Sequence, residues 1–384
     1  MLSLALRLVV MCLTVVPSTA QLCPSKKLLT FNVGLNPRVT KYESRKKIVP
    51  DALKEHTDVD VMCLQEVWYE KDMTNFLNAL KPTYPYHYSF IHHAPSQLRS
   101  SSGIFSWIFG RFRTAPCLSA SIFPLGYCMV RQCKGVKGNA MLGCLTQKCT
   151  EQLEAISQDC IACLLMSSID PLSALSKCVN VLSYYNKMNG QGLLLLSKKP
   201  ILNVQKTLFF PGVKQMLARG FITADVAGLG KVVCTHLTAN IHLPYIEWNK
   251  DELKAMSWEE QQRNEINNIH YHLDGRKHIL MGDLNTGPAI TNPGEEPIVG
   301  EYPSNFAALL TYGYTSLYEG EDGRCTWCRD NPLHQQRSPS KILDHIMMTG
   351  FNGRNATRTM GVYRGQQLSD HYGMTLNVCH NIFY

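Results

Sequence analysis

Short apolar runs recur along the chain, and most of them end in polar or turn-forming residues. Runs rich in Val, Ile, Leu and Phe are typical of buried strands. We therefore expect strands over residues 28–33, 59–64, 192–196, 220–226, 231–235, 278–282, 342–348 and 373–378. Residues 42–56 carry apolar positions at helical spacing, and the polar segment 258–273 is compatible with a helix. This mixture predicts a layered α/β (α+β) domain.

The segment 96–180 differs from its surroundings because it is rich in cysteine. Its eight cysteines stand at positions 117, 128, 133, 144, 149, 160, 163 and 178. Eight is an even number, so the segment can close on itself through disulfides, and its second half looks helical. Expected strands continue on both sides of it. We therefore predict a cysteine-rich, partly helical insertion within a discontinuous main domain of residues 21–95 and 181–384.

Two features of this region have alternative interpretations. The pairs Cys160-Ile-Ala-Cys163 and Cys325-Thr-Trp-Cys328 have the spacing of zinc ligands, but a zinc site needs reduced thiols. Segment 103–113 combines apolar aromatic residues with two arginines. Such a segment suits a membrane interface, and it equally suits a buried contact between the insertion and the main domain.

The N-terminus and the cysteine count both predict export. Residues 1–20 resemble a secretory signal peptide, with Arg7, an apolar run and small residues at 17–20. A membrane anchor is the alternative, but the run is short. Of the 15 cysteines, Cys12 lies in this signal, and the even remainder is typical of an oxidising compartment. Asn355 begins an Asn-Ala-Thr glycosylation sequon. We therefore expect a secreted, extracellular glycoprotein.

Composition and charge narrow the class of protein and partner. With 45% hydrophobic and 18% charged residues, the chain can bury a core, which excludes a disordered polymer. The formal net charge of +8 favours an anionic partner: lipid headgroups, nucleic acid or phosphate esters. Charge alone does not choose among these three. No motif indicates an obligate protein partner.

Polar residues that a core does not need stand at the ends of several expected strands. Each alone is more often a turn, a cap or a satisfied core group than a catalytic residue. Six such positions in succession indicate a ligand site at the strand ends. They are Asn32, Gln65-Glu66, His236, Asp283 with Asn285, Asp344-His345 and Asp370-His371.

The motifs around these residues resemble one family. In chain order they are LLTFNVG, DVMCLQEVW, NGQGLLLLSKKPI, ARGFITADV, VVCTHL, ILMGDLN, ILDHIMM and LSDHYG. They resemble the endonuclease/exonuclease/phosphatase superfamily, which includes pancreatic deoxyribonuclease and the neutral sphingomyelinases. The resemblance covers nearly the whole mature chain except the cysteine-rich segment. It implies a deoxyribonuclease-like, two-layer β-sandwich flanked by helices, with the site at one end of the sheets.

The resemblance also implies a metal ion. Glu66 would be its main carboxylate ligand, with Asn32 beside it and Asp370 nearby or bound through water. A phosphodiester is negatively charged, and this charge must be neutralised for water to attack. A hard divalent ion does so and prefers oxygen ligands, so Mg²⁺ is the expected cofactor.

The remaining site residues would handle the proton and the phosphate. By resemblance, His371 is the general base and Asp344 orients its ring. Adjacent strand residues face opposite sides, so Asp344 is expected to serve this distant histidine rather than its chain neighbour. Asp283 and Asn285 would position the water and the phosphate. His236 would bond a phosphoryl oxygen in the transition state.

The residue two positions after Glu66 bears on the choice of substrate. Deoxyribonucleases place a basic residue there, whereas this chain has Trp68, similar to the aromatic residue of sphingomyelinases. An aromatic face attracts the quaternary ammonium of choline by about 0.5–2 kcal/mol. The alternative is an aromatic residue packed on the core. The first interpretation predicts a phospholipid substrate at a membrane surface, with sphingomyelin hydrolysed to ceramide and phosphocholine.

Three other functions are kept open. A secreted deoxyribonuclease-like endonuclease would use the same chemistry on nucleic acid. A catalytically silent relative would act as a binding protein, although such a relative would usually have lost a metal ligand or the base. A disulfide-rich adhesion or venom-like protein would account for the insertion but not for the site residues.

Overall fold

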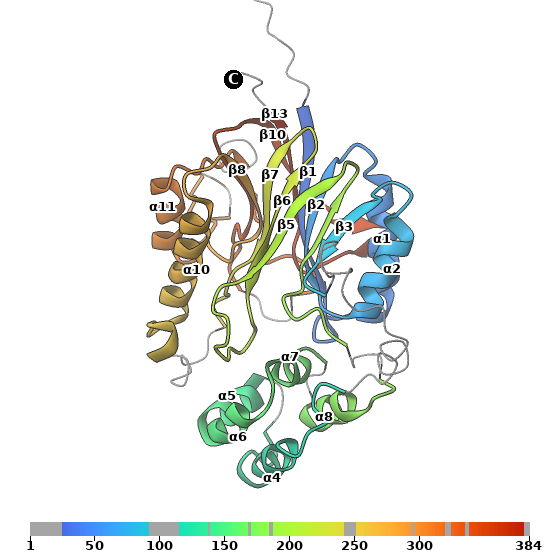
Figure 1. Ribbon diagram of the computed structural model, residues 1–384, viewed down its shortest axis with the longest axis vertical. Helices are drawn as coiled ribbons and strands as arrows, with labels where there is room; N and C mark the ends of the chain where they lie inside the picture. The colour runs from blue at the N-terminus through green and yellow to red at the C-terminus, as the bar shows by residue number, and fades with distance from the viewer. Residues whose placement is uncertain are drawn as a thin grey trace, which may run out of the picture.

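The computed structural model describes residues 25–91, 115–136, 139–167, 170–183, 187–241, 251–292, 294, 296–318, 324–334 and 338–379. Two β-sheets pack face to face, and helices cover their outer faces (Figure 1). This is the helix-flanked β-sandwich that the sequence predicts.

The first sheet has the strand order β10-β13-β1-β2-β4-β3. These strands are β10 (Asn352–Thr359), β13 (Gly373–Cys379), β1 (Ser25–Leu35), β2 (Val61–Val67), β4 (Leu194–Ser197) and β3 (Tyr86–Ser89). Strand β1 runs parallel to β2 and antiparallel to β13. The carboxyl ends of β1 and β2 and the start of β13 therefore share one end of the sheet. Helices α1 (Tyr42–Glu55) and α2 (Glu70–Leu80) cover its outer face (Figure 1).

The second sheet has the strand order β5-β6-β7-β8-β9. These strands are β5 (Ile201–Leu208), β6 (Gly220–Val226), β7 (Gly230–His236), β8 (His278–Asp283) and β9 (Asp344–Thr349). Strands β7 and β8 are parallel, and β9 is antiparallel to β8. Helices α10 (Trp258–Leu273) and α11 (Pro303–Thr311) cover the outer face (Figure 1). A small hairpin, β11 (Val362–Tyr363) with β12 (Gln366–Gln367), precedes β13.

The inner faces of the two sheets form a continuous apolar core. Leu28 of the first sheet and Ile222 of the second belong to the same buried cluster. Within it, Cys63 of β2 forms a disulfide with Cys234 of β7, which joins the two sheets covalently. The central strands read as nearly continuous apolar runs because both of their faces are covered.

The insertion lies between β3 and β4 and is helical. Its helices are α4 (Ile122–Gln132), α5 (Asn139–Lys148), α6 (Thr150–Ala155), α7 (Gln158–Ser167) and α8 (Pro171–Val179). They form a group beneath the sandwich in Figure 1. The eight cysteines pair only with one another, as Cys117–Cys160, Cys128–Cys149, Cys133–Cys144 and Cys163–Cys178. The apolar side of the insertion nevertheless continues into the core beneath α1 and α2.

The alternative zinc site is wrong. Cys160 and Cys163 are bonded within the insertion, and Cys325 forms a disulfide with Cys328. None of these four sulfurs is a free thiolate that could bind zinc.

Segments 1–20 and 103–113, expected as a signal peptide and as an interface or packing segment, lie outside the described residues. Across the ranges that the structure describes, no helix has the length and apolar character needed to cross a membrane.

Candidate active site

Three of the predicted site residues stand side by side at one end of the second sheet. The register pairs His236, the last residue of β7, with Asp283, the last residue of β8. Asp283 is in turn paired with Asp344, the first residue of β9. Side chains at paired positions point to the same face. The strand pairing therefore assembles a row of three polar side chains from segments far apart in the sequence.

The first sheet brings the other residues to the same end of the sandwich. Asn32 and Glu66 lie near the carboxyl ends of the parallel strands β1 and β2. Asp370 and His371 directly precede β13, which starts at this end because it is antiparallel to β1. The site residues of the two sheets therefore lie at the same end of the sandwich.

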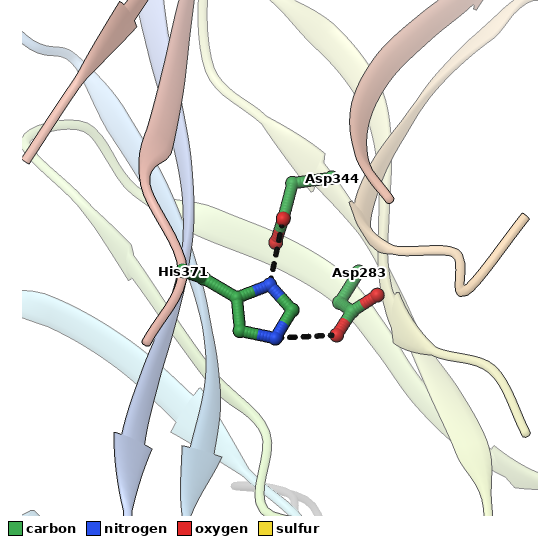
Figure 2. Close-up of side chains that lie close together, drawn as sticks. All are labelled: Asp283, Asp344 and His371. Atoms are coloured by element: carbon green, nitrogen blue, oxygen red, sulfur yellow. Dashed lines mark hydrogen bonds and ion pairs between the residues drawn. The ribbon is translucent and has the colours of Figure 1, made fainter. Parts of the chain in front are cut away.

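Asp283 contacts residues from both sheets. Its Oδ2 accepts a hydrogen bond of 2.9 Å from Asn32 Nδ2, and His236 Nε2 lies 3.3 Å from the same oxygen. His371 Nε2 is 3.7 Å from it (Figure 2). Its other oxygen, Oδ1, accepts a 3.0 Å hydrogen bond from the backbone N–H of Asn285. Both histidines lower the pKa of Asp283 despite its burial, so it is a carboxylate that holds the site together.

The ring of His371 is oriented by a buried carboxylate. Its Nδ1 lies 2.8 Å from Oδ2 of Asp344, while Nε2 points toward Asp283 (Figure 2). The expected contact of Asp344 with a distant histidine is therefore present. Burial alone lowers the pKa of His371, but the charges of Asp344 and Asp283 outweigh it and raise the pKa to about 10. Trp327 packs edge-on against this ring, with 4.7 Å between centroids, and limits its rotation.

Asp283, Asp344 and His371 are also close enough together to hold a metal ion, with ligand atoms within 4.8 Å of one another. However, both nitrogens of the His371 ring already face a carboxylate oxygen. A ring protonated on both nitrogens can donate to both carboxylates, so no ion is needed to satisfy them. The trio is therefore suited to proton transfer, and other carboxylates at this end of the sandwich are available for a cation.

The residues expected to bind the cation do fit one. Oε2 of Glu66 accepts hydrogen bonds from Asn36 Nδ2 at 2.9 Å and from Trp68 Nε1 at 3.2 Å. Burial raises the pKa of Asp370; the charge of His371 counteracts this, and the charge of Glu66 adds to it. Two carboxylates that repel each other in a buried site are stabilised by a hard cation with oxygen ligands.

Local backbone geometry holds these carboxylates in place. Glu66 has a positive φ of 61°, which is rare for a residue with a side chain and recurs at functional sites. Gly192 packs against it, and a Cβ on Gly192 would lie 3.3 Å from the backbone of Glu66. Gly34 has a φ of 54°, and a Cβ there would collide with the carboxylate of Asp370. Both glycines are needed for this close approach.

Arg219 is a site residue that the sequence analysis did not assign. Its guanidinium NH1 lies 2.8 Å from Nδ1 of His236, and its side chain is buried. Arginine only donates hydrogen bonds, so Nδ1 must accept and the proton of a neutral ring must sit on Nε2, facing Asp283. Burial and the charge of Arg219 lower the pKa of His236, which keeps it neutral. The sequence signal that could have identified Arg219 as a site residue is a single arginine directly before a buried strand.

The predicted choline contact of Trp68 is corrected by the structure. Trp68 is only 1% exposed and belongs to the core beneath α1 and α2. The guanidinium of Arg219 already lies over its ring, 5.8 Å from the centroid. The ring face is therefore not accessible to a choline ammonium. What Trp68 offers the site is its indole N–H, which donates to Glu66.

This geometry gives a testable prediction for Trp68. Trp68→Phe keeps an aromatic ring under Arg219 but removes the donor to Glu66. Loss of a hydrogen bond to a metal ligand typically costs 10–100-fold in metal affinity or activity. With Glu66 as the expected ligand of a divalent cation, we expect the Mg²⁺ concentration that half-saturates the site to rise about 10–100-fold. The matched control is Tyr84→Phe, which removes a buried hydroxyl bonded to the carbonyls of His56 and Val59, before β2. Equal Mg²⁺ dependence in both variants would contradict the assignment.

Two predicted residues lie apart from the central contacts. The side chain of Asn285 donates to the backbone oxygen of Leu237 at 3.0 Å, so it ties β8 to the loop after β7. Its expected role in positioning the phosphate stays a prediction. Asn355 and Thr357 of the sequon are exposed on β10, where a glycan would be accessible.

Comparison with known proteins identifies the family of the chain. The profile of the Endonuclease/Exonuclease/phosphatase family matches residues 29–371, so the chain belongs to this family of hydrolases. The family expected from the motifs is thereby confirmed. Among curated proteins, no sequence matches the chain significantly.

Solved structures share the fold at low sequence identity. SmcL aligns with a TM-score of 0.50 and 15% identity over 93% of this chain and 99% of its own. An endonuclease/exonuclease/phosphatase from Beutenbergia cavernae aligns with a TM-score of 0.51 and 14% identity over 92% and 71%. Sphingomyelinase C from Streptomyces griseocarneus aligns with a TM-score of 0.45 and 14% identity over 92% and 99%. At these identities the likeness concerns the fold.

Proposed function

We propose that the protein is a secreted, metal-dependent phosphodiesterase. The observation that carries this proposal is the His371 ring, held by Asp344 on one side and facing Asp283 on the other, beside the carboxylates of Glu66 and Asp370. The positive charge of a cation bound at these carboxylates would lower the pKa of His371. The neutral ring, with its Nδ1 proton donated to Asp344, could then take a proton from an attacking water. The adjacent pair of carboxylates suits a divalent cation.

Each residue then has a defined task. Glu66 and Asp370, with Asn32, would hold the ion, and Mg²⁺ bound there would supply positive charge that neutralises the phosphodiester. His371 accepts the proton, and Asp344 keeps the accepting nitrogen aimed at the site. The Nε2 proton of His236, which faces Asp283 in this structure, would turn to a phosphoryl oxygen of the bound substrate.

We further propose that the substrate is a choline phospholipid such as sphingomyelin, cleaved to ceramide and phosphocholine. Support comes from helix α4 of the insertion. Phe123, Tyr127 and Val130 form a stripe on one side of this helix and are 76%, 65% and 58% exposed. Arg131 and Lys134 stand beside the stripe and are exposed as well. Exposed aromatic and aliphatic residues next to cations suit the interface of an anionic membrane.

A direct comparison of substrates tests this proposal. The purified protein is assayed on sphingomyelin vesicles and on duplex DNA, each with Mg²⁺ and with a chelator. We expect Mg²⁺-dependent release of phosphocholine that the chelator abolishes, and little cleavage of DNA. Efficient cleavage of DNA with inert sphingomyelin would favour a nuclease. Binding to vesicles without turnover of either substrate would favour a silent binding protein.

A further inference from the structure

Helix α7 joins the insertion to the catalytic domain close to the candidate active site. The hydroxyl of Tyr69, three residues after Glu66 in the chain, donates a 2.8 Å hydrogen bond to the backbone oxygen of Met166. Arg38 donates from NH1 to the backbone oxygen of Leu165 at 3.2 Å. The four disulfides within the insertion limit how far α7 can move relative to its own neighbours. The insertion therefore presents a fixed surface to the site.

Between α7 and the catalytic domain lies a pocket of about 120 Å³, which we call the α7 pocket. Leu165 and Met166 form its wall on the insertion side. Met216, Ala239 and Trp258 form the wall on the side of the catalytic domain. The lining is mostly apolar, and its volume is close to the ~150 Å³ of an apolar cavity that binds benzene.

The α7 pocket adjoins the candidate active site. Arg219 lines the pocket and also contacts His236, the residue proposed to donate to the phosphate. Thr238, two residues after His236, lines it as well. A group bound in the pocket would therefore lie close to a phosphate held at His236.

The polar residues around the pocket are engaged with other protein groups. Arg219 is held at His236. Thr238 bonds Glu265 through both its backbone N–H and its hydroxyl, at 2.8 and 2.5 Å. Gln261 donates to the Thr238 hydroxyl at 3.0 Å. A nucleobase placed here would lose the water around its ring nitrogens and gain few partners, which is costly. A hydrocarbon has no such cost and gains from burial.

We propose that the α7 pocket binds the first carbons of the hydrocarbon part of the substrate, next to the scissile phosphate. The insertion thereby becomes one wall of the substrate-binding site and selects phosphodiesters that carry an alkyl group. This inference rests on the proposed phosphodiesterase function and narrows its substrate class. Each buried methylene should strengthen binding about fourfold until the pocket is full.

The test uses alkyl phosphocholines from methyl to octyl, kept below their micelle concentrations. For the natural protein, kcat/KM should rise by about fourfold per methylene and level off near hexyl. Ala239→Phe fills the pocket and should flatten this rise. Ala227→Phe, in the turn between β6 and β7 at the opposite end of the sheet, is the matched control and should keep the rise.

The outcomes separate the pocket from the chemistry. A natural protein without chain-length dependence, or an Ala239→Phe variant that keeps it, would overturn the role of the pocket. So would an Ala239→Phe variant impaired mainly on duplex DNA. If no diester is cleaved at all, the proposed function fails, and calorimetry with hexyl phosphocholine decides about the pocket. Binding to the natural protein that Ala239→Phe abolishes would support it, and equal binding would overturn it.

Discussion

Replacing His371 with alanine should lower the turnover of a phosphodiester by about 10²–10⁴-fold, as the loss of a general base does. The ring has the geometry that this role requires, because Asp344 holds Nδ1 at 2.8 Å and the other nitrogen faces the site. His236, the other histidine beside Asp283, is not placed to replace it, because Arg219 holds it and its proton points toward Asp283. The loss should appear in kcat, since the base acts on the attacking water.

Two measurements keep this prediction distinct from unfolding or loss of metal. The near-ultraviolet circular dichroism of His371→Ala should match that of the natural protein, and its Mg²⁺ dependence is measured separately because Asp370 is adjacent. His272→Ala is the matched control. His272 lies in the last turn of α10, which leads into the start of β8, the end opposite Asp283. A folded His371→Ala protein with unchanged kcat would refute the assignment of His371 as the general base.

The interior strands were predictable from the sequence, whereas the edge strands β5 and β10 were not. β6, β7 and β8 coincide with the expected runs because both their faces are buried, which selects continuous apolar residues. β5 and β10 stand at sheet edges, and their sequences ILNVQKTL and NGRNATRT are largely polar and exposed. An edge strand needs only one paired neighbour, and polar residues there protect it from unwanted pairing. Its sequence therefore resembles a loop.

Some helices were also predictable from the sequence, and others were not. α1 and α10 lie where helical segments were expected. The cysteine-rich segment was expected to be partly helical, but α6 has only six residues and α8 nine. Isolated helices of this length are marginal in water. Disulfides and packing against the catalytic domain hold them, and neither can be deduced from local sequence.

The positions of the site residues and the contact between Asp344 and His371 were readable from the sequence, but the surroundings of His236 and Trp68 were not. Polar residues at strand ends located His236, Asp283 and Asp344, because strand ends are where a sheet presents ligands. The bond between Arg219 and His236 depends on the pairing of β6 with β7. The direction of Trp68 depends on the positive φ of Glu66, which interrupts the alternation along β2. Alternation alone gave no means to tell an exposed ring from a buried one.

Removing the disulfide between Cys63 and Cys234 should destabilise the protein more than removing any of the disulfides within the insertion. The two cysteines are 171 residues apart in the chain, whereas Cys133 and Cys144 are separated by 11. In the chain-entropy model, a cross-link stabilises by restricting the unfolded chain, and the effect grows with the logarithm of loop length. The long loop corresponds to about 5 kcal/mol and the short one to about 3 kcal/mol.

The position of the Cys63–Cys234 bond increases this difference. It joins β2 to β7 inside the core shared by the two sheets, and both side chains are fully buried. We expect Cys63→Ala with Cys234→Ala to lower the free energy of unfolding by about 2–5 kcal/mol in non-reducing urea titrations. Cys133→Ala with Cys144→Ala is the matched control and should cost less. Adding a reductant to all three proteins should remove most of the difference between them. If both double variants unfold at the urea midpoint of the natural protein, the covalent link between the sheets does not contribute to stability.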